Sequence, residues 1–118
     1  MSGVAAVGLG GALGAVARYG ISLLPLRGGF PWLTLATNLL GALLIGCVVG
    51  IAENGRLPFG AVLFWKTGVC GGFTTFSTFS LETLQLLEDG KTGWSAAYAA
   101  LSVALCIAGV WCGRSMVK

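Results

Sequence analysis

Long apolar segments separated by short polar turns dominate this chain and constrain its fold more than any other feature. Residues 4–24, 32–52, 59–87 and 94–112 are mostly apolar, and all three prolines lie between these segments. A helix needs about 20 mostly apolar residues to cross the hydrocarbon core of a bilayer. The pattern therefore predicts an all-α membrane protein in which residues 1–118 form a single subunit of four transmembrane helices.

The composition agrees with a chain surrounded by lipid, since 56% of the residues are hydrophobic and 9% are charged. In soluble domains about a quarter of the residues are charged. The seven Lys and Arg residues are scattered along the chain and do not form the basic patch that nucleic-acid binding requires. The four cysteines have no CxxC spacing and no histidine to help bind a metal, so we interpret them as small apolar packing residues.

The third apolar segment is too long for one straight crossing, and it contains the polar stretch GGFTTFSTFS at residues 71–80. Glycine weakens a helix, and hydroxyl groups can bond the backbone groups that a broken helix frees. We therefore predict that the third transmembrane helix is broken in mid-membrane, with one half ending near Gly71 and the other starting near Thr75. The first half would present carbonyl oxygens that suit a cation, and the second would present N–H groups that suit an anion.

The basic residues outside the spans are almost evenly divided between the two sides of the membrane that four crossings define. Arg56, Arg114 and Lys118 lie on the side of the termini, whereas Arg27 and Lys91 lie on the other side. Orientation is normally set by an excess of Lys and Arg in cytoplasmic loops. This balance permits insertion in both orientations, and an antiparallel dual-topology homodimer would then provide an inverted repeat.

Glycine pairs four residues apart occur in the first two spans, at Gly10 and Gly14 and at Gly46 and Gly50. Such faces let helices approach closely. Packing between the spans of one subunit explains these pairs at least as well as a contact between two subunits.

Phe76 and Phe79 share one face of the predicted second half-helix, because residues three apart are neighbours on a helix. Aromatic rings carry a positive edge, so two rings turned edge-on to a narrow path would line it for an anion without a trapping charge. An isolated pair of this kind is more often lipid-facing or part of a core. The interleaved Ser77, Thr78 and Ser80 make that interpretation less favoured here, because five hydroxyl residues within residues 71–80 exceed what helix bending requires.

Two other spans place polar groups at a similar depth. Asn38 lies about a third of the way into the second span, where it is either an interhelical contact or a ligand-binding amide. Tyr98, Ser102 and Cys106 recur every four residues on the fourth span. They form a polar track on one face, although packing alone also produces such a pattern.

The spans contain few charged groups, and their types limit which ions the protein could transport. Arg18 is costly within a span and is interpreted as structural, whereas Lys66 is equally consistent with a structural role and with an attraction for anions. The role of Glu82, one turn beyond Phe79, stays open. The first two spans contain no carboxylate before Glu53 and the chain has no histidine, so a proton relay has few groups to use. Compact donors suit a small anion that holds water tightly.

The stretch GGFTTFSTFS, together with ARYG at residues 17–20 and TNLLGALLIG at residues 37–46, resembles the Fluc (CrcB) family of fluoride channels. The resemblance covers the length and the span order of the whole chain. It implies an ion channel and not an enzyme, built as an antiparallel dual-topology homodimer with two pores and surrounded by the lipid of the cell inner membrane. It also implies passive export of fluoride from the cytoplasm, which protects the cell from fluoride toxicity.

The same resemblance implies roles for individual residues. Backbone carbonyls of Gly71 and Thr74 from both subunits would hold a structural sodium ion at the dimer centre. Cys106 stands where the polar track would have another hydroxyl, and a thiol is a weaker donor. Polar donors and phenylalanine ring edges would lead fluoride through the membrane, at residues Asn38, Phe76, Ser77, Thr78, Phe79, Tyr98 and Ser102.

Two other classes of protein share parts of this pattern. A small dual-topology multidrug transporter has four spans and balanced charge, but it needs a membrane carboxylate, normally in the first span, and residues 4–24 contain none. A non-transporting scaffold would use the polar stretch only to hold helices together. The scaffold interpretation predicts that Phe76 and Phe79 tolerate Leu or Ile and that the purified protein moves no ion.

Overall fold

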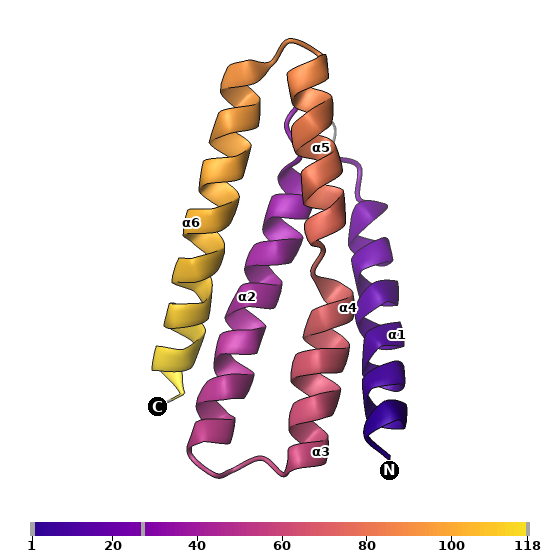
Figure 1. Cartoon of the computed structure of the whole chain (residues 1–118), viewed down its shortest axis with the longest axis vertical. Coiled ribbons are helices and arrows are strands. Elements are labelled where there is room, and N and C mark those ends of the chain that lie inside the picture. The colour runs from indigo at the N-terminus through magenta and orange to yellow at the C-terminus, as the bar shows by residue number, and fades with distance from the viewer. Residues whose placement is uncertain (1, 27, 118) are drawn as a thin grey trace.

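The computed structural model describes residues 2–26 and 28–117, which form an elongated helical bundle with principal extents of 48 × 28 × 21 Å (Figure 1). The long helices are α1 (Gly3–Ser22), α2 (Trp32–Glu53) and α6 (Thr92–Met116). Between α2 and α6 the chain continues through α3 (Phe59–Val62), the π-helix η1 (Leu63–Cys70), α4 (Gly71–Phe73) and α5 (Phe76–Glu88). The described residues contain no strand, and the predicted all-α class is confirmed.

Three helices of the described chain are long and apolar enough to cross a membrane, namely α1, α2 and α6. Large apolar side chains are exposed along the bundle, as expected where lipid or another subunit replaces water. The chain is therefore a multi-pass membrane protein. The segment from α3 to α5 is longer than one straight crossing needs, but no single helix within it is long enough to cross.

Turn residues set the ends of the long helices close to the predicted positions. The hydroxyl of Ser2 accepts a hydrogen bond from the N–H of Ala5 at 3.1 Å and caps the start of α1. Pro31 directly precedes α2, in agreement with the fixed φ of proline at helix starts. After α2, Gly55 has a φ of 71°, a left-handed conformation that glycine adopts without a steric cost.

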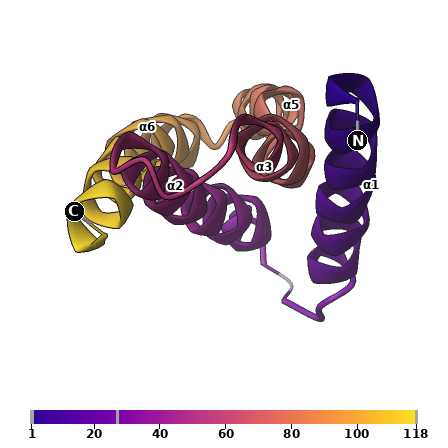
Figure 2. The same cartoon turned by 90° about the horizontal axis from the view of Figure 1, so that it is seen from below.

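Glycines bring α2 and α6 into direct backbone contact, and the two helices lie side by side in both views (Figures 1 and 2). A Cβ at Gly46 would collide with the carbonyl of Val110, and one at Gly113 would collide with the carbonyl of Leu43. Substitution of Gly50 would likewise crowd the end of α6. The glycine pair of the second span therefore packs within the subunit.

The glycine pair of the first span packs within the subunit as well. Figure 2 shows α1 on the other side of the interrupted segment from α2 and α6. Gly10 faces Gly68 of η1 so closely that a Cβ on either residue would lie 2.9 Å from the Cα of the other. A Cβ at Gly14 would collide with the carbonyl of Val69. The backbone of α1 thus rests directly on the backbone of η1 and α4.

The interruption lies two to three residues later than the glycine pair suggests. Gly71 and Gly72 are helical, and the extended residues are Thr74, with φ −91° and ψ 156°, and Thr75, with φ −149° and ψ 118°. A Cβ at Gly72 would collide with the carbonyl of Gly11 on α1. The second glycine therefore permits close helix packing, and the helix stops at the threonines.

Both termini and the turn between α2 and α3 lie at one end of the bundle, as four crossings require (Figure 1). At this end the guanidinium of Arg114 pairs with the carboxylate of Glu53 through two bonds of 2.7 and 2.8 Å. Arg56 donates to the carbonyl of Val117 at 2.8 Å. Two of the basic residues that were counted to compare the two sides of the membrane, at positions 27 and 118, lie outside the described residues.

A small hydrophobic core lies between α2, α5 and α6, toward the opposite end. It is formed by Leu35, Leu86 and the fully buried Tyr98, with Phe30 and Phe79 packed against it. This core positions the part of α5 that follows the interruption.

Candidate functional site

The two extended threonines stop the helix because their own groups satisfy the nearest backbone. The N–H and the hydroxyl of Thr74 both donate to the carbonyl of Cys70, at 3.0 and 2.8 Å. The hydroxyl of Thr75 accepts from the N–H of Thr78 at 3.1 Å and caps the start of α5. The N–H of Thr74 thus keeps a helical bond, and the hydroxyl of Thr75 replaces the helical acceptor of Thr78 that the interruption removes.

Asn38 of α2 holds the interruption from outside. Its Oδ1 accepts from the N–H of Thr75 at 2.9 Å, and its Nδ2 donates to the carbonyl of the same residue at 3.1 Å. This reciprocal pair satisfies both backbone groups of an extended residue that no helix serves. An amide nitrogen carries two donors, so Asn38 keeps one N–H for another partner. Asn38 is an interhelical contact, and its remaining donor is compatible with a second role.

Arg18 of α1 reaches the same region. Its Nε donates to the carbonyl of Gly72 at 3.1 Å, close to the end of α4. The last carbonyls of a helix lack intrahelical donors and carry partial negative charge, so a guanidinium stabilises them. This contact supports the structural role predicted for Arg18.

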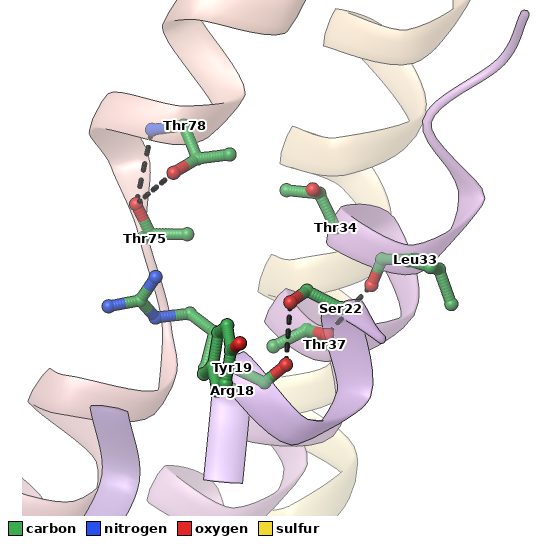
Figure 3. A pocket seen from close by; sticks show the side chains of 8 residues that line it. All are labelled: Arg18, Tyr19, Ser22, Leu33, Thr34, Thr37, Thr75 and Thr78. Atoms are coloured by element: carbon green, nitrogen blue, oxygen red, sulfur yellow. Dashed lines mark hydrogen bonds between the residues drawn. The ribbon is translucent and has the colours of Figure 1, made fainter. Parts of the chain in front are cut away.

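Hydroxyl groups line a small cavity of about 130 Å³ beside Arg18 (Figure 3). In Figure 3 the guanidinium of Arg18 lies near Thr75, and Thr75 is linked to Thr78 by two hydrogen bonds. The hydroxyl of Ser77 lies 3.2 Å from that of Thr75. The cavity is lined by Arg18, Tyr19, Ser22, Leu33, Thr34, Thr37, Thr75 and Thr78. Donors from three elements therefore converge where the helix is interrupted.

A second, larger cavity of about 330 Å³ shares Thr75 with the first. Its lining combines small apolar side chains with a few polar groups and one phenylalanine ring. The residues are Asn38, Gly41, Ala42, Ile45, Lys66, Cys70, Gly71, Thr74, Thr75, Phe76, Cys106 and Val110. Three of the predicted pathway residues line these two cavities, Thr78 the first and both Asn38 and Phe76 the second. The other four line neither cavity, namely Ser77, Phe79, Tyr98 and Ser102.

Phe76 and Phe79 are neighbours, as the sequence predicts, but their surroundings differ. Their ring centroids lie 5.5 Å apart with an interplanar angle of 41°. The ring of Phe76 is 78% exposed, whereas Phe79 is partly buried and packs against Tyr98 at 5.1 Å between centroids. Phe79 is therefore part of the core, and Phe76 projects from the subunit.

The polar track of α6 is buried along most of its length. Tyr98 is fully buried, and its hydroxyl donates to Oε1 of Glu82 at 3.0 Å. Ser102 is also buried, and within the described residues its hydroxyl has no hydrogen-bond partner. Cys106 lines the larger cavity. A buried hydroxyl without a partner is costly, so Ser102 has a donor available for a further group.

The carbonyl oxygens of Gly71 and Thr74 are the type of ligand that the implied sodium ion takes. Thr75 donates to Asn38 and not to Gly71, and among the described residues neither of the two carbonyls accepts a hydrogen bond at the interruption. Gly71 is exposed and has open space around its Cα. Hard cations take oxygen ligands such as backbone carbonyls, typically about six of them. One subunit would supply two, so the set is compatible with a site completed by a second copy.

Comparison with known proteins identifies the family. The sequence matches the family model described as "CrcB-like protein, Camphor Resistance (CrcB)" over residues 5–114. This chain belongs to the CrcB family. A protein of Ruminiclostridium cellulolyticum named fluoride-specific ion channel FluC is 44% identical, with 100% of this chain and 94% of that protein covered. A protein of the same name from Nitrobacter winogradskyi is 46% identical, with 98% and 94% covered.

A third CrcB relative, from Thermus thermophilus, is also named fluoride-specific ion channel FluC. It is 50% identical over 96 residues, which cover 79% of this chain and 77% of that protein. The family is thus one of fluoride ion channels and not of enzymes.

Three features of this CrcB chain were not predicted from its sequence. Two are hydrogen bonds, from Arg18 to Gly72 and from Tyr98 to Glu82, and the third is the eight-residue π-helix η1. A charged residue inside an apolar span was the available signal for Arg18 and Glu82, because such residues are rarely left without a partner. The π-helix has no comparable sequence signal.

Proposed function

We propose that this chain is the subunit of a fluoride-selective channel that lets fluoride leave the cytoplasm passively and so protects the cell from fluoride toxicity. The observation that supports this most is the similarity of the chain, over almost its full length, to proteins named fluoride-specific ion channels. A cell interior that is electrically negative drives an anion outward, by about 2.3 kcal/mol per charge per 100 mV. No further energy source is needed.

In this proposal, fluoride meets compact donors where the helix is interrupted. The second N–H of Asn38 and the hydroxyls of Ser77 and Thr78 would replace part of its water shell, which is how filters admit small ions. The ring edges of Phe76 and Phe79 would continue the path, because they carry partial positive charge without binding an anion tightly.

The path would then follow the polar track of α6. The hydroxyl of Ser102, which has no partner among the described residues, would be a free donor on this track. The single O–H of Tyr98 donates to Glu82, so Tyr98 would bind fluoride only by exchanging that bond. The thiol of Cys106 is weaker, so this end of the track would contribute less than the rest.

The working channel would be an antiparallel dual-topology homodimer with two pores, embedded in the cell inner membrane. Residues 1–118 would then be a single four-span subunit, in which α3, η1, α4 and α5 together make the third crossing, broken in mid-membrane. The high exposure of Phe76 supports a contact with a second copy, since an isolated ring of that exposure lines no closed path. The even division of basic residues supports insertion in both orientations.

A structural sodium ion would join the two copies at the dimer centre. The carbonyls of Gly71 and Thr74 from both subunits would hold it, and its charge would fix the two interruptions relative to each other. Support comes from the two carbonyls, which accept no hydrogen bond from the described residues around the interruption.

Passive efflux from liposomes tests the proposal. Purified protein is reconstituted into liposomes loaded with potassium fluoride or potassium chloride, and efflux is started with a potassium ionophore and followed with anion electrodes. We expect fast release of fluoride and negligible release of chloride. Release of neither anion, from protein that is monodisperse before reconstitution, would reject the channel and favour a scaffold.

A further inference from the structure

Lys66 is a charged residue that the proposed path does not yet use. It lies in η1 and lines the larger cavity together with Asn38, Thr74 and Phe76. Within residues 2–26 and 28–117, its ammonium takes part in no ion pair or hydrogen bond. A cation within a membrane span is costly, and such residues usually pair with another group or mark an ion pathway.

The other groups of this cavity offer Lys66 no counter-charge. Among the described residues, the lining contains no Asp or Glu, and its polar side chains are one amide, two threonine hydroxyls and two thiols. Glu53 is paired with Arg114, and Glu82 accepts from Tyr98. The cavity is thus a small space with one positive charge and several neutral donors, which is the composition that attracts an anion.

The position of Lys66 along the chain fits this role. It lies after the start of the segment at Phe59 and eight residues before Thr74, the first extended residue of the interruption. An anion that approaches along this segment would therefore meet the ammonium before it meets Phe76. Low-dielectric walls around a cavity of one sign concentrate the field and raise the local concentration of counter-ions.

We propose that Lys66 is the anion-attracting residue of the larger cavity and that it draws small inorganic anions toward Phe76. This inference rests on the proposed channel function, and it adds the residue that raises the local fluoride concentration. Lys66 acts through charge at a distance and forms no lasting bond to fluoride. Its effect must therefore be largest at low ionic strength and small when salt screens it.

The test compares initial fluoride efflux for wild type, Lys66→Met, Lys66→Gln and Lys66→Arg in liposomes. Each protein is measured at about 10 mM and about 300 mM ionic strength, set with potassium glutamate, because the screening length falls from about 30 Å to well under 10 Å over this range. We expect Lys66→Met and Lys66→Gln to lose about tenfold in rate at low ionic strength and less than about threefold at high ionic strength. Lys66→Arg keeps the charge and the wild-type rate.

Lys91→Gln is the matched control, because it removes the same charge from a residue outside the cavity that lies over the ring of Trp94. A second readout is the dependence of the rate on fluoride concentration. Loss of attraction raises the half-saturating concentration of Lys66→Met by about tenfold and leaves its maximal rate nearly unchanged. Removal of a charge from a span does not impair insertion, so these variants are expected to fold.

Three outcomes would overturn the inference. If the neutral variants match wild type at low ionic strength, Lys66 attracts no permeating anion and instead extends to the lipid phosphates. If their loss is the same at both ionic strengths, or if Lys91→Gln loses as much, the effect is structural or belongs to the whole surface. If wild type itself releases no fluoride, the proposed function fails and the inference fails with it.

Discussion

The two halves of the interrupted helical segment are held in different ways. Before the interruption, η1 and α4 rest on α1 through backbone contacts, in which Gly10 faces Gly68 and Gly72 faces Gly11. After it, α5 is attached to α6 by side chains. The hydroxyl of Ser95 donates to the carbonyl of Thr83 at 3.0 Å, and further along the same face a tyrosine hydroxyl donates to a glutamate.

This difference separates most of the supporting contacts from the proposed path, although η1 and α4 also line the larger cavity through Lys66, Cys70 and Gly71. Backbone contact between glycines is close packing that leaves no space for water or ions. Side-chain contact leaves hydroxyls, an amide and an exposed ring next to cavities. The predicted pathway residues accordingly lie on α5 and α6 and, in the case of Asn38, on α2. None of them lies on α1. The predictions below perturb the contacts of each half or of the interruption between them, each with a control variant elsewhere in the chain.

The largest effect is expected for Gly14→Leu in the supporting half. Its side chain would collide with the backbone of Val69 and Phe73, which cannot move without displacing α4. Overpacking against backbone costs about 3 kcal/mol or more, so most of the protein should be lost as aggregate. The yield of monodisperse protein in detergent, measured by size-exclusion chromatography, checks this. Gly8→Leu is the control, because a Cβ at Gly8 meets nothing within 4 Å, and equal losses for both variants would contradict the packing role.

Asn38→Asp should have the next largest effect, because Asn38 bonds both backbone groups of Thr75 at the interruption. An ionised carboxylate only accepts, so the carbonyl of Thr75 loses its donor and faces a negative oxygen. We expect fluoride efflux to fall at least about tenfold, which corresponds to about 1.4 kcal/mol in the barrier. Asn54→Asp makes the same change at an exposed end of the bundle and should leave efflux unaltered. Normal efflux in Asn38→Asp would remove this residue from the path.

Phe76 and Phe79 allow an effect on efflux to be distinguished from an effect on stability. Phe76→Ile and Phe79→Ile should each lower fluoride efflux by about tenfold or more while the dimer still assembles, since both lose a positive ring edge. Phe79→Ile should also lower stability by about 1 kcal/mol, because Phe79 packs on Tyr98, whereas the exposed Phe76 contributes little. Thermal stability in detergent and efflux are measured on the same preparations.

Phe59→Ile is the control for both phenylalanine variants, because Phe59 is exposed and lines neither cavity. Wild-type efflux in Phe76→Ile and Phe79→Ile would reject the ring-edge mechanism but not the channel. Equal stability of the two variants would show that Phe79 is not part of the core.

Tyr98→Phe is expected to have the smallest effect. It removes one hydroxyl that donates to Glu82 and keeps the buried ring in place. The loss should be about 1–2 kcal/mol of stability, since the carboxylate of Glu82 loses a partner in a partly buried site. Thermal unfolding in detergent measures it, with the exposed Tyr19→Phe as the control. A Tyr98→Phe protein as stable as wild type would mean that Glu82 is satisfied by another group.

The spans and the polar stretch could be predicted from the sequence because both depend on local composition. Helix ends agree with the predicted ones within a few residues, since proline, glycine and polar turns mark them. The resemblance placed Asn38 near both phenylalanines, and in the structure Asn38 and Phe76 line one cavity whereas Phe79 packs against the core. The second half-helix starts at Phe76, next to the predicted Thr75, whereas the first half ends at Phe73, later than the predicted Gly71. Gly72 stays helical and permits the close approach of Gly11, a contact that only the neighbouring helix reveals.

Hydropathy determined the class of this protein and its apolar segments, and the motif of residues 71–80 pointed to its family. These properties depend on residues that are close together in the chain, so the sequence by itself was sufficient to predict them. The partners across helices were decided only by the tertiary structure: Arg18 with the end of α4, Asn38 with Thr75, and Tyr98 with Glu82. Each of these bonds depends on two helices approaching to within hydrogen-bond distance, and glycine contacts elsewhere in the bundle set that approach.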